Sequence, residues 1–306
     1  MRDGEPLEVL VIRLGALGDF VLSFGPFAAI RARHPTARVT LLTTAPFAEV
    51  GGLSPWFDRV LVDERPDIWN LPGLVALARR LHGYDLVYDL QTSARSAWYF
   101  RLAGRPAWSG VAAGCSLPHS NPRRDFMHTM ERQREQMEMA GLTDFPAPDL
   151  AWAARRSAPA LPPHAALLVP GAAPHRPAKR WPAERFGELA WVLVARGMTP
   201  VIVGAKAEAP LASAIRAICP GAIDLVGQTD LPAIAALASR AELAIGNDTG
   251  PMHLAAAMGC RCVVLFSAAS DPDLTAPRGP GGTWPTVLRE NDLADLPVAR
   301  VAAALA

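Results

Sequence analysis

The chain has 306 residues, of which 50% are hydrophobic and 19% charged, with a formal net charge of +1. This composition predicts a globular protein with ample core, and the length favours two domains. It excludes a disordered chain, which needs low hydrophobicity and high net charge, and it argues against a nucleic-acid binder, which needs a strongly basic balance.

The first half of the chain alternates short apolar runs with segments of helical period. Apolar runs predict strands at residues 8–12, 39–42, 60–62 and 86–90. Apolar residues at helical spacing predict helices at residues 19–33, 71–81 and 94–102. Strands that alternate with amphipathic helices are typical of βαβ units, so we expect an α/β domain with a mostly parallel sheet.

A stretch rich in Pro and Ala, residues 147–164, predicts the connection to a second α/β series. Strands are then expected at residues 166–169, 200–203, 223–226, 243–245 and 262–266. Helices are expected at residues 183–195, 208–218, 231–238, 251–258 and, at the alanine-rich end, 292–306. We therefore predict two Rossmann-like domains, residues 1–155 and 156–306, that face a central cleft.

No run approaches the ~18 consecutive apolar residues that span a bilayer, and acids precede the first apolar run. We therefore expect no signal peptide or transmembrane helix, and a cytoplasmic location. The four cysteines form no CxxC pair and have no partner at zinc-finger spacing, so we expect neither a disulfide framework nor a metal site.

The loop at residues 13–19 follows the first predicted strand, at the edge of the sheet where ligands of α/β proteins bind. Gly15 and Gly18 let the backbone turn tightly and approach a ligand. Asp19 stands at the helix entrance, as a site residue or as an ordinary N-cap. The spacing is not GxGxxG and no acid closes the next strand, which counts against a dinucleotide site.

A second loop, GNDTGPMH at residues 246–253, leads from a strand into a helix. Pro251 suits the first turn, so Asp248, Thr249 and Gly250 should straddle the helix N-terminus, where free N–H groups attract phosphate. His253 lies one turn further on and either leans toward the same anion or is a buried structural histidine.

A basic segment follows the first strand of the second domain, at residues 170–182. It is either a solvated loop or a source of charge for a diphosphate. Lys179 in it is one of only two lysines in the chain, which favours a role for a compact ammonium group.

Four stretches together resemble glycosyltransferase family 9, the ADP-heptose:lipopolysaccharide heptosyltransferases. They are VLVIRLGALGDFVLSFGPFAAIRARHP, YDLVYDLQTSARSAWYFRLAG, KRWPAERFGELA and LVGQTDLPAIAALASRAELAIGNDTGPMHLAAAMGCRCVVLFS. The resemblance implies a GT-B fold whose C-terminal domain holds the nucleotide-sugar donor. It also implies that the N-terminal domain binds the acceptor, a lipid-linked saccharide. This acceptor is the growing lipopolysaccharide core at the cytoplasmic face of the inner membrane. The terminal helix is able to pack back on the N-terminal domain.

The resemblance also implies roles for individual residues. Asp19 matches the family's catalytic base, and Lys179 matches a lysine that contacts phosphate. Glu208 falls where an acid binds the nucleotide ribose. The diphosphate-binding loop corresponds to Asp248, Thr249, Gly250 and His253. The sequence departs from the family at residues 267–272, where SAASDP replaces a Gly-Pro-Thr type of turn beside the donor sugar.

These roles predict inversion by direct displacement, with Asp19 as the base. Lys179, the amides of the second loop and the helix dipole would stabilise the departing diphosphate, so no metal or other cofactor is expected. The candidates for binding the acceptor or a membrane surface are arginines interleaved with aromatic residues. The alternative is that these arginines form an ordinary solvated face and that the aromatic residues belong to the core. The arginines are Arg95, Arg101, Arg105, Arg123 and Arg124, and the aromatics are Trp98, Tyr99 and Trp108.

Three alternatives remain open from the sequence. The first is a transferase or epimerase of the GT-B type that uses another nucleotide sugar. The second is an NAD-dependent oxidoreductase built on the first loop, and the third is a non-catalytic protein that binds a sugar nucleotide.

Overall fold

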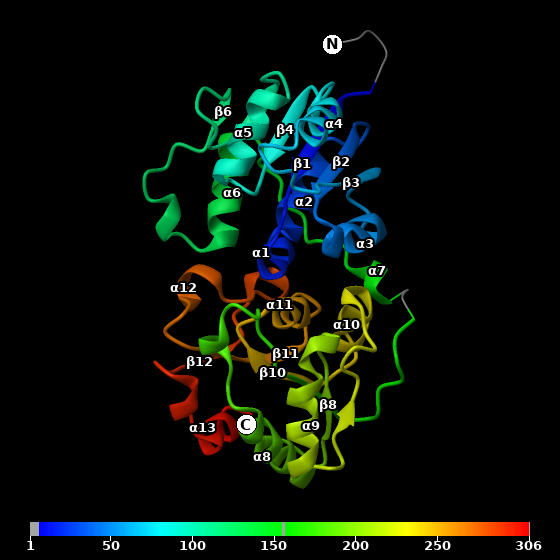
Figure 1. Ribbon diagram of the computed structural model, residues 1–306, viewed down its shortest axis with the longest axis vertical. Coiled ribbons are helices and arrows are strands. Elements are labelled where there is room, and N and C mark those ends of the chain that lie inside the picture. Colours follow the sequence, from blue (N-terminus) through cyan, green and yellow to red (C-terminus); the bar gives the residue numbers. More distant parts are fainter. Residues whose placement is uncertain (1–5, 155–156, 306) are drawn as a thin grey trace. The chain divides into compact units, whose positions relative to one another are not determined.

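The computed structural model describes residues 6–154 and 157–305. The chain divides into two compact units, Met1–Asp149 and Leu150–Ala306, and each is built around its own six-stranded sheet (Figure 1). The predicted domain boundary, between residues 155 and 156, lies outside the described residues.

In the first unit, parallel strands are arranged in the order β3-β2-β1-β4-β5-β6. The strands are β1 (Glu8–Ile12), β2 (Arg38–Thr43), β3 (Arg59–Val62), β4 (Leu86–Asp89), β5 (Ala107–Gly110) and β6 (Leu117–Pro118). The α-helices are α1 (Leu17–Leu22), α2 (Phe24–Arg33), α3 (Ala45–Leu53), α4 (Leu71–Leu81), α5 (Ala94–Leu102) and α6 (Thr129–Met139), and η1 (Arg124–Phe126) is a 3₁₀ turn.

In the second unit, parallel strands are arranged in the order β12-β11-β10-β7-β8-β9. The strands are β7 (Ala165–Val169), β8 (Thr199–Ile202), β9 (Ile223–Asp224), β10 (Leu243–Asn247), β11 (Arg261–Phe266) and β12 (Thr286–Arg289). The α-helices are α7 (Ala151–Ala154), α8 (Ala183–Ala195), α9 (Ala209–Ile218), α10 (Leu231–Ala238), α11 (Gly250–Ala257), α12 (Pro272–Thr275) and α13 (Val298–Ala303). The 3₁₀ turns are η2 (Pro177–Lys179), η3 (Lys206–Glu208), η4 (Pro280–Gly282) and η5 (Leu293–Asp295).

Both sheets have the Rossmann strand order, which reverses direction at one point. The reversal lies between β1 and β4 in the first sheet and between β7 and β10 in the second. Ligands of open α/β sheets bind in the crevice beyond the carboxyl ends of the strands at this point. The fold thus assigns each unit one loop pair for binding: the loops after β1 and β4, and those after β7 and β10.

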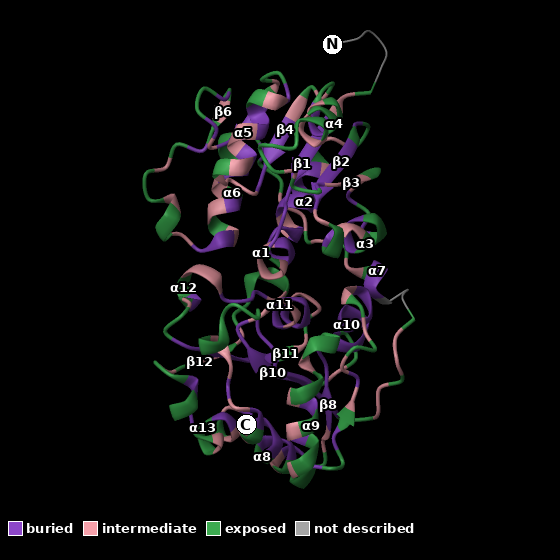
Figure 2. Ribbon diagram, in the orientation of Figure 1, coloured by how far each residue is buried: buried purple, intermediate pink, exposed green. Residues whose placement is uncertain are grey.

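The central strands are apolar except at their ends, because helices cover both faces of a parallel sheet. Every residue of β7 and of β10 is buried, and β10 is drawn as buried in Figure 2. Side chains from alternate positions enter different cores: Leu168 packs with Phe186 of α8, whereas Leu167 packs with Met252 of α11. Both faces of β7 and β10 are therefore covered by packed side chains.

The predicted helix at residues 19–33 is two helices, α1 and α2, that break at Ser23. Pro26 has no N–H for the carbonyl of Leu22, and its ring would clash with that carbonyl in a continuous helix. The hydroxyl of Ser23 donates instead to the carbonyl of Asp19 at 2.8 Å. The break ends α1 shortly after Asp19.

Helix α6 was not predicted because its buried face is polar. Gln133 and Gln136 are both buried. Gln133 donates to the Ser23 hydroxyl at 2.9 Å, and Gln136 donates to the carbonyl of Asp89 at 3.0 Å. Patterns of hydrophobic spacing cannot detect a helix that packs through amides.

The prediction also missed helix α3 and strands β5, β6 and β12, which are short or only partly buried. The predicted connection contains α7, whose Trp152 is buried and which packs on α10. The terminal helix is shorter than predicted, because Pro297 starts α13, and α13 packs on α8 of its own unit.

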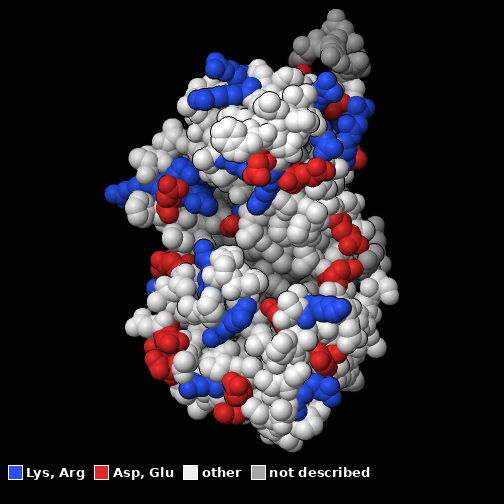
Figure 3. Space-filling view, in the orientation of Figure 1, with Lys and Arg blue, Asp and Glu red and all other residues white. Residues whose placement is uncertain are grey.

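None of the helices in the described part of the chain is long and apolar enough to cross a bilayer. Basic and acidic side chains are interspersed over the face shown in Figure 3, in keeping with the net charge of +1.

We expect Gly246→Ala to lower the free energy of unfolding by about 1–3 kcal/mol, because β10 and β7 approach too closely for a methyl group. A Cβ at this position would lie 2.6 Å from Cβ of Val169 and 2.7 Å from its carbonyl oxygen. Gly221→Ala is the matched control, since its Cβ would have no atom within 4 Å. Chemical denaturation measures both, and equal stability of the two variants would contradict the packing.

Candidate functional site

At the reversal point of the second sheet, the side chain of Asn247 joins the loops after β10 and β7. It is fully buried. Its Oδ1 accepts a hydrogen bond from the backbone N–H of Trp181 at 3.0 Å, and its Nδ2 donates to the carbonyl of Pro170 at 2.7 Å. A buried side-chain amide whose oxygen and nitrogen are both hydrogen-bonded holds its partners in place, because the loss of either bond would leave a buried polar group unpaired. Asn247 thereby holds the basic segment against the end of β10.

The segment held in this way carries Lys179, whose ammonium group pairs with Asp248. Both side chains are largely buried, with 12% and 6% exposed. His253 completes the cluster, with Nε2 at 3.8 Å from Asp248 Oδ1. Burial alone would raise the pKa of Asp248, but the bonds from His253 and Lys179 outweigh it and bring this pKa to about 2. The carboxylate is therefore ionised and fixes two side chains able to face an anion.

The cluster lies at the start of α11. Thr249 is the N-cap residue and has extended backbone, and Gly250 is the first helical residue. N–H groups in the first turn of a helix have no partner within the helix and carry the positive end of its dipole. The Nδ1 atom of His253 is buried and has no hydrogen-bond partner among the described residues. This helix start can hold a diphosphate.

Glu208 lies in a cradle made by two glycines after neighbouring strands. A Cβ at Gly171, after β7, would lie 1.5 Å from Glu208 Oε1, and one at Gly204, after β8, would lie 2.4 Å from Oε2. The Ala205 N–H donates to Oε2 at 2.8 Å. Burial raises the pKa of Glu208, and the Ala205 bond and the charge of Arg180 oppose this shift. The structure thus brings Glu208 to the same sheet edge as Lys179 and Asp248.

In the first unit, Asp19 lies in the first turn of α1 but does not cap it. The N-cap residue is Ala16, and Asp19 Oδ1 lies 3.3 Å from Nη2 of Arg13. About a third of the Asp19 side chain (36%) is exposed, whereas Arg13 is buried. Burial lowers the pKa of Arg13, and the charge of Asp19 opposes the shift. The aspartate is therefore an accessible carboxylate held by a buried cation.

The two glycines of this loop differ in what they do. Gly15 has φ +126°, and a Cβ there would lie 2.9 Å from the Phe47 ring. Both constraints require glycine. Gly18 lies within α1 and is partly exposed.

Asp89, at the end of β4, is a buried acid close to Arg13 that the sequence analysis did not select. Its Oδ1 accepts from the N–H groups of Gln91 and Thr92 at 3.1 and 3.0 Å. Burial raises the pKa of Asp89 to about 6, against these bonds and the charge of Arg13. Arg13 was likewise overlooked. A charged residue at the carboxyl end of each of the two strands at the reversal point, directly after β1 and as the last residue of β4, is the signal that would have found both.

The arginines proposed for the acceptor lie in different surroundings. Arg95 donates to the Tyr99 hydroxyl at 3.3 Å. Arg101, Arg105 and Arg123 are exposed. Of the aromatic residues interleaved with them, Tyr99 and Trp108 are buried in the core. This sequence stretch therefore does not form one continuous aromatic surface.

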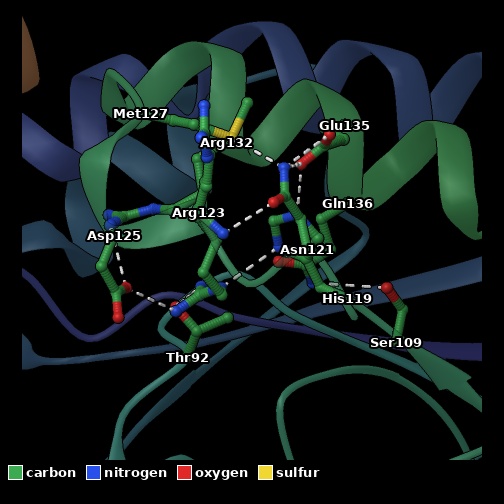
Figure 4. Close-up of polar contacts among 11 residues, drawn as sticks. Thr92, Ser109, His119, Asn121, Arg123, Asp125, Met127, Arg132, Glu135 and Gln136 are labelled. Atoms are coloured by element: carbon green, nitrogen blue, oxygen red, sulfur yellow. Dashed lines mark hydrogen bonds and ion pairs between the residues drawn. The ribbon is translucent and has the colours of Figure 1, made fainter.

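A polar network joins the loop after β4, the segment after β6 and α6 (Figure 4), and Arg124 of η1 takes part in it. Arg124 donates to the Thr92 hydroxyl at 3.0 Å and to His119 Nδ1 at 3.3 Å. His119 Nε2 bonds Glu135 at 2.7 Å, and Asn121 bonds the same carboxylate at 2.8 Å. The His119 and Asn121 bonds lower the pKa of Glu135. Arg124 is thus fixed beside the carboxyl end of β4.

An Asp-x-Asp string, Asp271-Pro272-Asp273, of the kind that binds metal in other transferases, begins in the divergent segment 267–272 and ends one residue beyond it. Here Asp271 starts α12, and its Oδ1 accepts from the Asp273 N–H at 3.1 Å. No group of three or more metal-binding side chains gathers within residues 6–154 and 157–305. Metal independence stays a prediction.

Comparison with known proteins assigns the chain to a family. The model described as "Glycosyltransferase family 9 (heptosyltransferase)" matches residues 74–292. Lipooligosaccharide heptosyltransferase 2 of Haemophilus ducreyi is 25% identical, over 89% of this chain and 86% of the relative. Lipopolysaccharide heptosyltransferase 2 of Salmonella typhimurium is 25% identical, over 89% and 85%.

Solved structures agree in fold. Escherichia coli ADP-heptose lipopolysaccharide heptosyltransferase II has a TM-score of 0.77 at 23% identity, with 98% of this chain and 97% of that chain covered. Escherichia coli heptosyltransferase WaaC with ADP-2-deoxy-2-fluoro heptose has a TM-score of 0.80 at 21% identity, over 98% and 99%. The prediction of a GT-B fold is confirmed. The family match favours a glycosyltransferase over the oxidoreductase and the non-catalytic alternatives. The chain is an enzyme that belongs to glycosyltransferase family 9.

Proposed function

We propose that this enzyme transfers a heptose, or a closely related sugar, from an ADP-sugar to the saccharide core of a lipopolysaccharide-type acceptor, with inversion and without a metal ion. The observation that carries the proposal is the Lys179–Asp248–His253 cluster at the start of α11, in a chain of glycosyltransferase family 9. The relatives named above are heptosyltransferases, which supports the choice of sugar and acceptor.

The second unit is the proposed donor-binding unit. Transfer releases a nucleoside diphosphate, so the enzyme must stabilise negative charge on the leaving group. Lys179 supplies a cation, and the Thr249 and Gly250 amides supply donors at the positive end of α11. Asp248 is itself an anion, so we assign it the positioning of Lys179 and His253 rather than direct contact with phosphate. We assign Glu208, which lies at the same sheet edge, the acceptance of hydrogen bonds from ribose hydroxyls.

Asp19 is the proposed base in the first unit. Its carboxylate accepts the proton of the acceptor hydroxyl as that oxygen bonds to the anomeric carbon and the bond from this carbon to the diphosphate breaks. Arg13 keeps Asp19 oriented without covering it. Arg95, Arg101, Arg123 and Arg124 are candidates for the anionic groups of the acceptor, and Arg124 is the one that the structure holds beside the end of β4.

A thermal-shift screen of ADP-, UDP-, GDP- and CMP-sugars tests the donor assignment. Binding to the native state raises the melting temperature, and we expect a rise with ADP-sugars alone. A response to another nucleotide would contradict the choice of ADP. Turnover of the sugar nucleotide without any acceptor would favour the epimerase alternative.

Asp19→Asn should lower kcat by roughly 10²- to 10⁴-fold, the usual contribution of a general base. ADP affinity should stay within about twofold, because the donor is assigned to the other unit. Steady-state kinetics and calorimetric titration of ADP measure the two quantities. Turnover like that of the unmodified enzyme would remove Asp19 from the chemistry.

Lys179→Ala should weaken ADP binding by roughly ten- to a hundredfold, because it removes a charge-assisted bond and leaves the ionised Asp248 with His253 as its remaining charged partner. Lys206→Ala is the matched control, since it deletes the only other lysine, which is exposed. Equal ADP affinities of the two variants, measured by calorimetry, would exclude Lys179 from the donor site.

A further inference from the structure

Four large apolar side chains stand exposed in one short segment of the first unit. Ile68, Trp69, Leu71 and Val75 expose 66%, 86%, 68% and 50% of their surface, and we call this group the Trp69 surface. Trp69 is far more exposed than a tryptophan usually is in a globular protein. Clustered apolar exposure of this kind marks an interaction site, whereas isolated apolar residues do not.

Helix α4 explains why these side chains are not drawn into the core. Its buried face is formed by Leu77 and Leu81. Leu71 and Val75 lie four residues apart on another, exposed face. Asn70 caps the helix by accepting from the Gly73 N–H at 3.0 Å, which fixes the entry of the chain beside Trp69. The Trp69 surface is therefore the N-terminal end of an amphipathic helix whose core face is already occupied.

Each exposed row of α4 ends in an arginine. Arg79 continues the row of Leu71 and Val75 at the same spacing of four residues, and Arg80 continues the neighbouring row. Eight residues of helix place Arg79 about 12 Å along the axis from Leu71. Exposed charges also flank the surface in the preceding loop, where Glu64, Arg65 and Asp67 are found.

The Trp69 surface is connected to the loop of the proposed base. Strands β1 and β3 both pair in parallel with β2, where Ile12 and Leu61 have the same partner, Leu42. The loops after β1 and β3 therefore leave the same edge of the sheet. Arg65 joins them, because its Nη2 donates to the carbonyl of Leu14 at 2.9 Å.

We propose that the Trp69 surface docks on an anionic lipid bilayer, with its apolar side chains at the headgroup and acyl boundary and Arg79 and Arg80 at the level of the phosphates. Apolar residues that include tryptophan, followed by arginines, are typical of segments that lie in a membrane interface. The inference rests on the proposed function, in which the acceptor is lipid-linked. Docking through this surface brings the bilayer to the sheet edge that carries Asp19.

A second copy of the chain fits the surface less well. A stable interface between proteins takes roughly 20–30 residues from each side, whereas this one offers four apolar side chains with charges directly beside them. A bilayer needs no matching shape, and its anionic headgroups complement the arginines that end the two rows.

Vesicle flotation with the full chain tests the proposal. The probes are vesicles of phosphatidylethanolamine with phosphatidylglycerol, and vesicles of phosphatidylcholine alone. We expect binding to the anionic vesicles, about tenfold weaker binding for Trp69→Ser, and a similar loss for Arg79→Ser with Arg80→Ser. Trp191→Ser is the matched control: this tryptophan is 51% exposed but lies on α8 of the second unit. Thermal melting checks that each variant is folded.

Two outcomes overturn the proposal: vesicle binding that Trp69→Ser leaves unchanged, and self-association that this substitution abolishes, which would identify the surface as an interface between copies. Sugar transfer to an acceptor without acyl chains tests the proposed function separately from membrane docking. Trp69→Ser should leave the rate of that reaction unchanged. If Trp69→Ser weakens vesicle binding but the unmodified enzyme transfers no sugar to this acceptor, the proposed function is contradicted and the docking surface is not.

Discussion

The pair between Lys179 and Asp248 is the interaction on which the candidate site of the second unit depends. Two largely buried charges are costly to remove from water unless each is paired, and the pairing here fixes both side chains at the start of α11. Asn247 bonds the backbone at both ends of the segment that carries Lys179. The site is thus prepared before any ligand arrives, which is how enzymes stabilise charge without reorganising.

The same topology in the two units accounts for where the chemistry gathers. In each sheet the strand order reverses between two central strands, and charged side chains stand at the carboxyl ends of these strands or in the loops that follow them. In the first unit Arg13 holds Asp19, and Asp89 stands beside Arg13. In the second unit Lys179 and Asp248 come from the two loops after β7 and β10. Equivalent positions in the two units thus carry different charged groups, to which we assign different roles.

Much of this could be predicted from the sequence, because buried parallel strands and amphipathic helices have strong patterns. Glycine and proline at helix starts marked the loops with Asp19 and Asp248. Helix α6 escaped prediction because amides line its buried face. Arg13 and Asp89 stand at the carboxyl ends of β1 and β4, but which strands meet at the reversal point is known only from the sheet order. Contacts such as Glu208 against two glycines depend on tertiary packing, which one sequence does not encode in any local pattern.

The central claim is that the start of α11 binds a nucleoside diphosphate, and titration of ADP followed by backbone amide resonances tests it most directly. The account predicts saturable shifts of the Thr249 and Gly250 amide signals and of the His253 ring, which lie around the proposed phosphate position. Saturable binding of ADP that leaves these resonances unmoved and shifts residues elsewhere in the chain would contradict it.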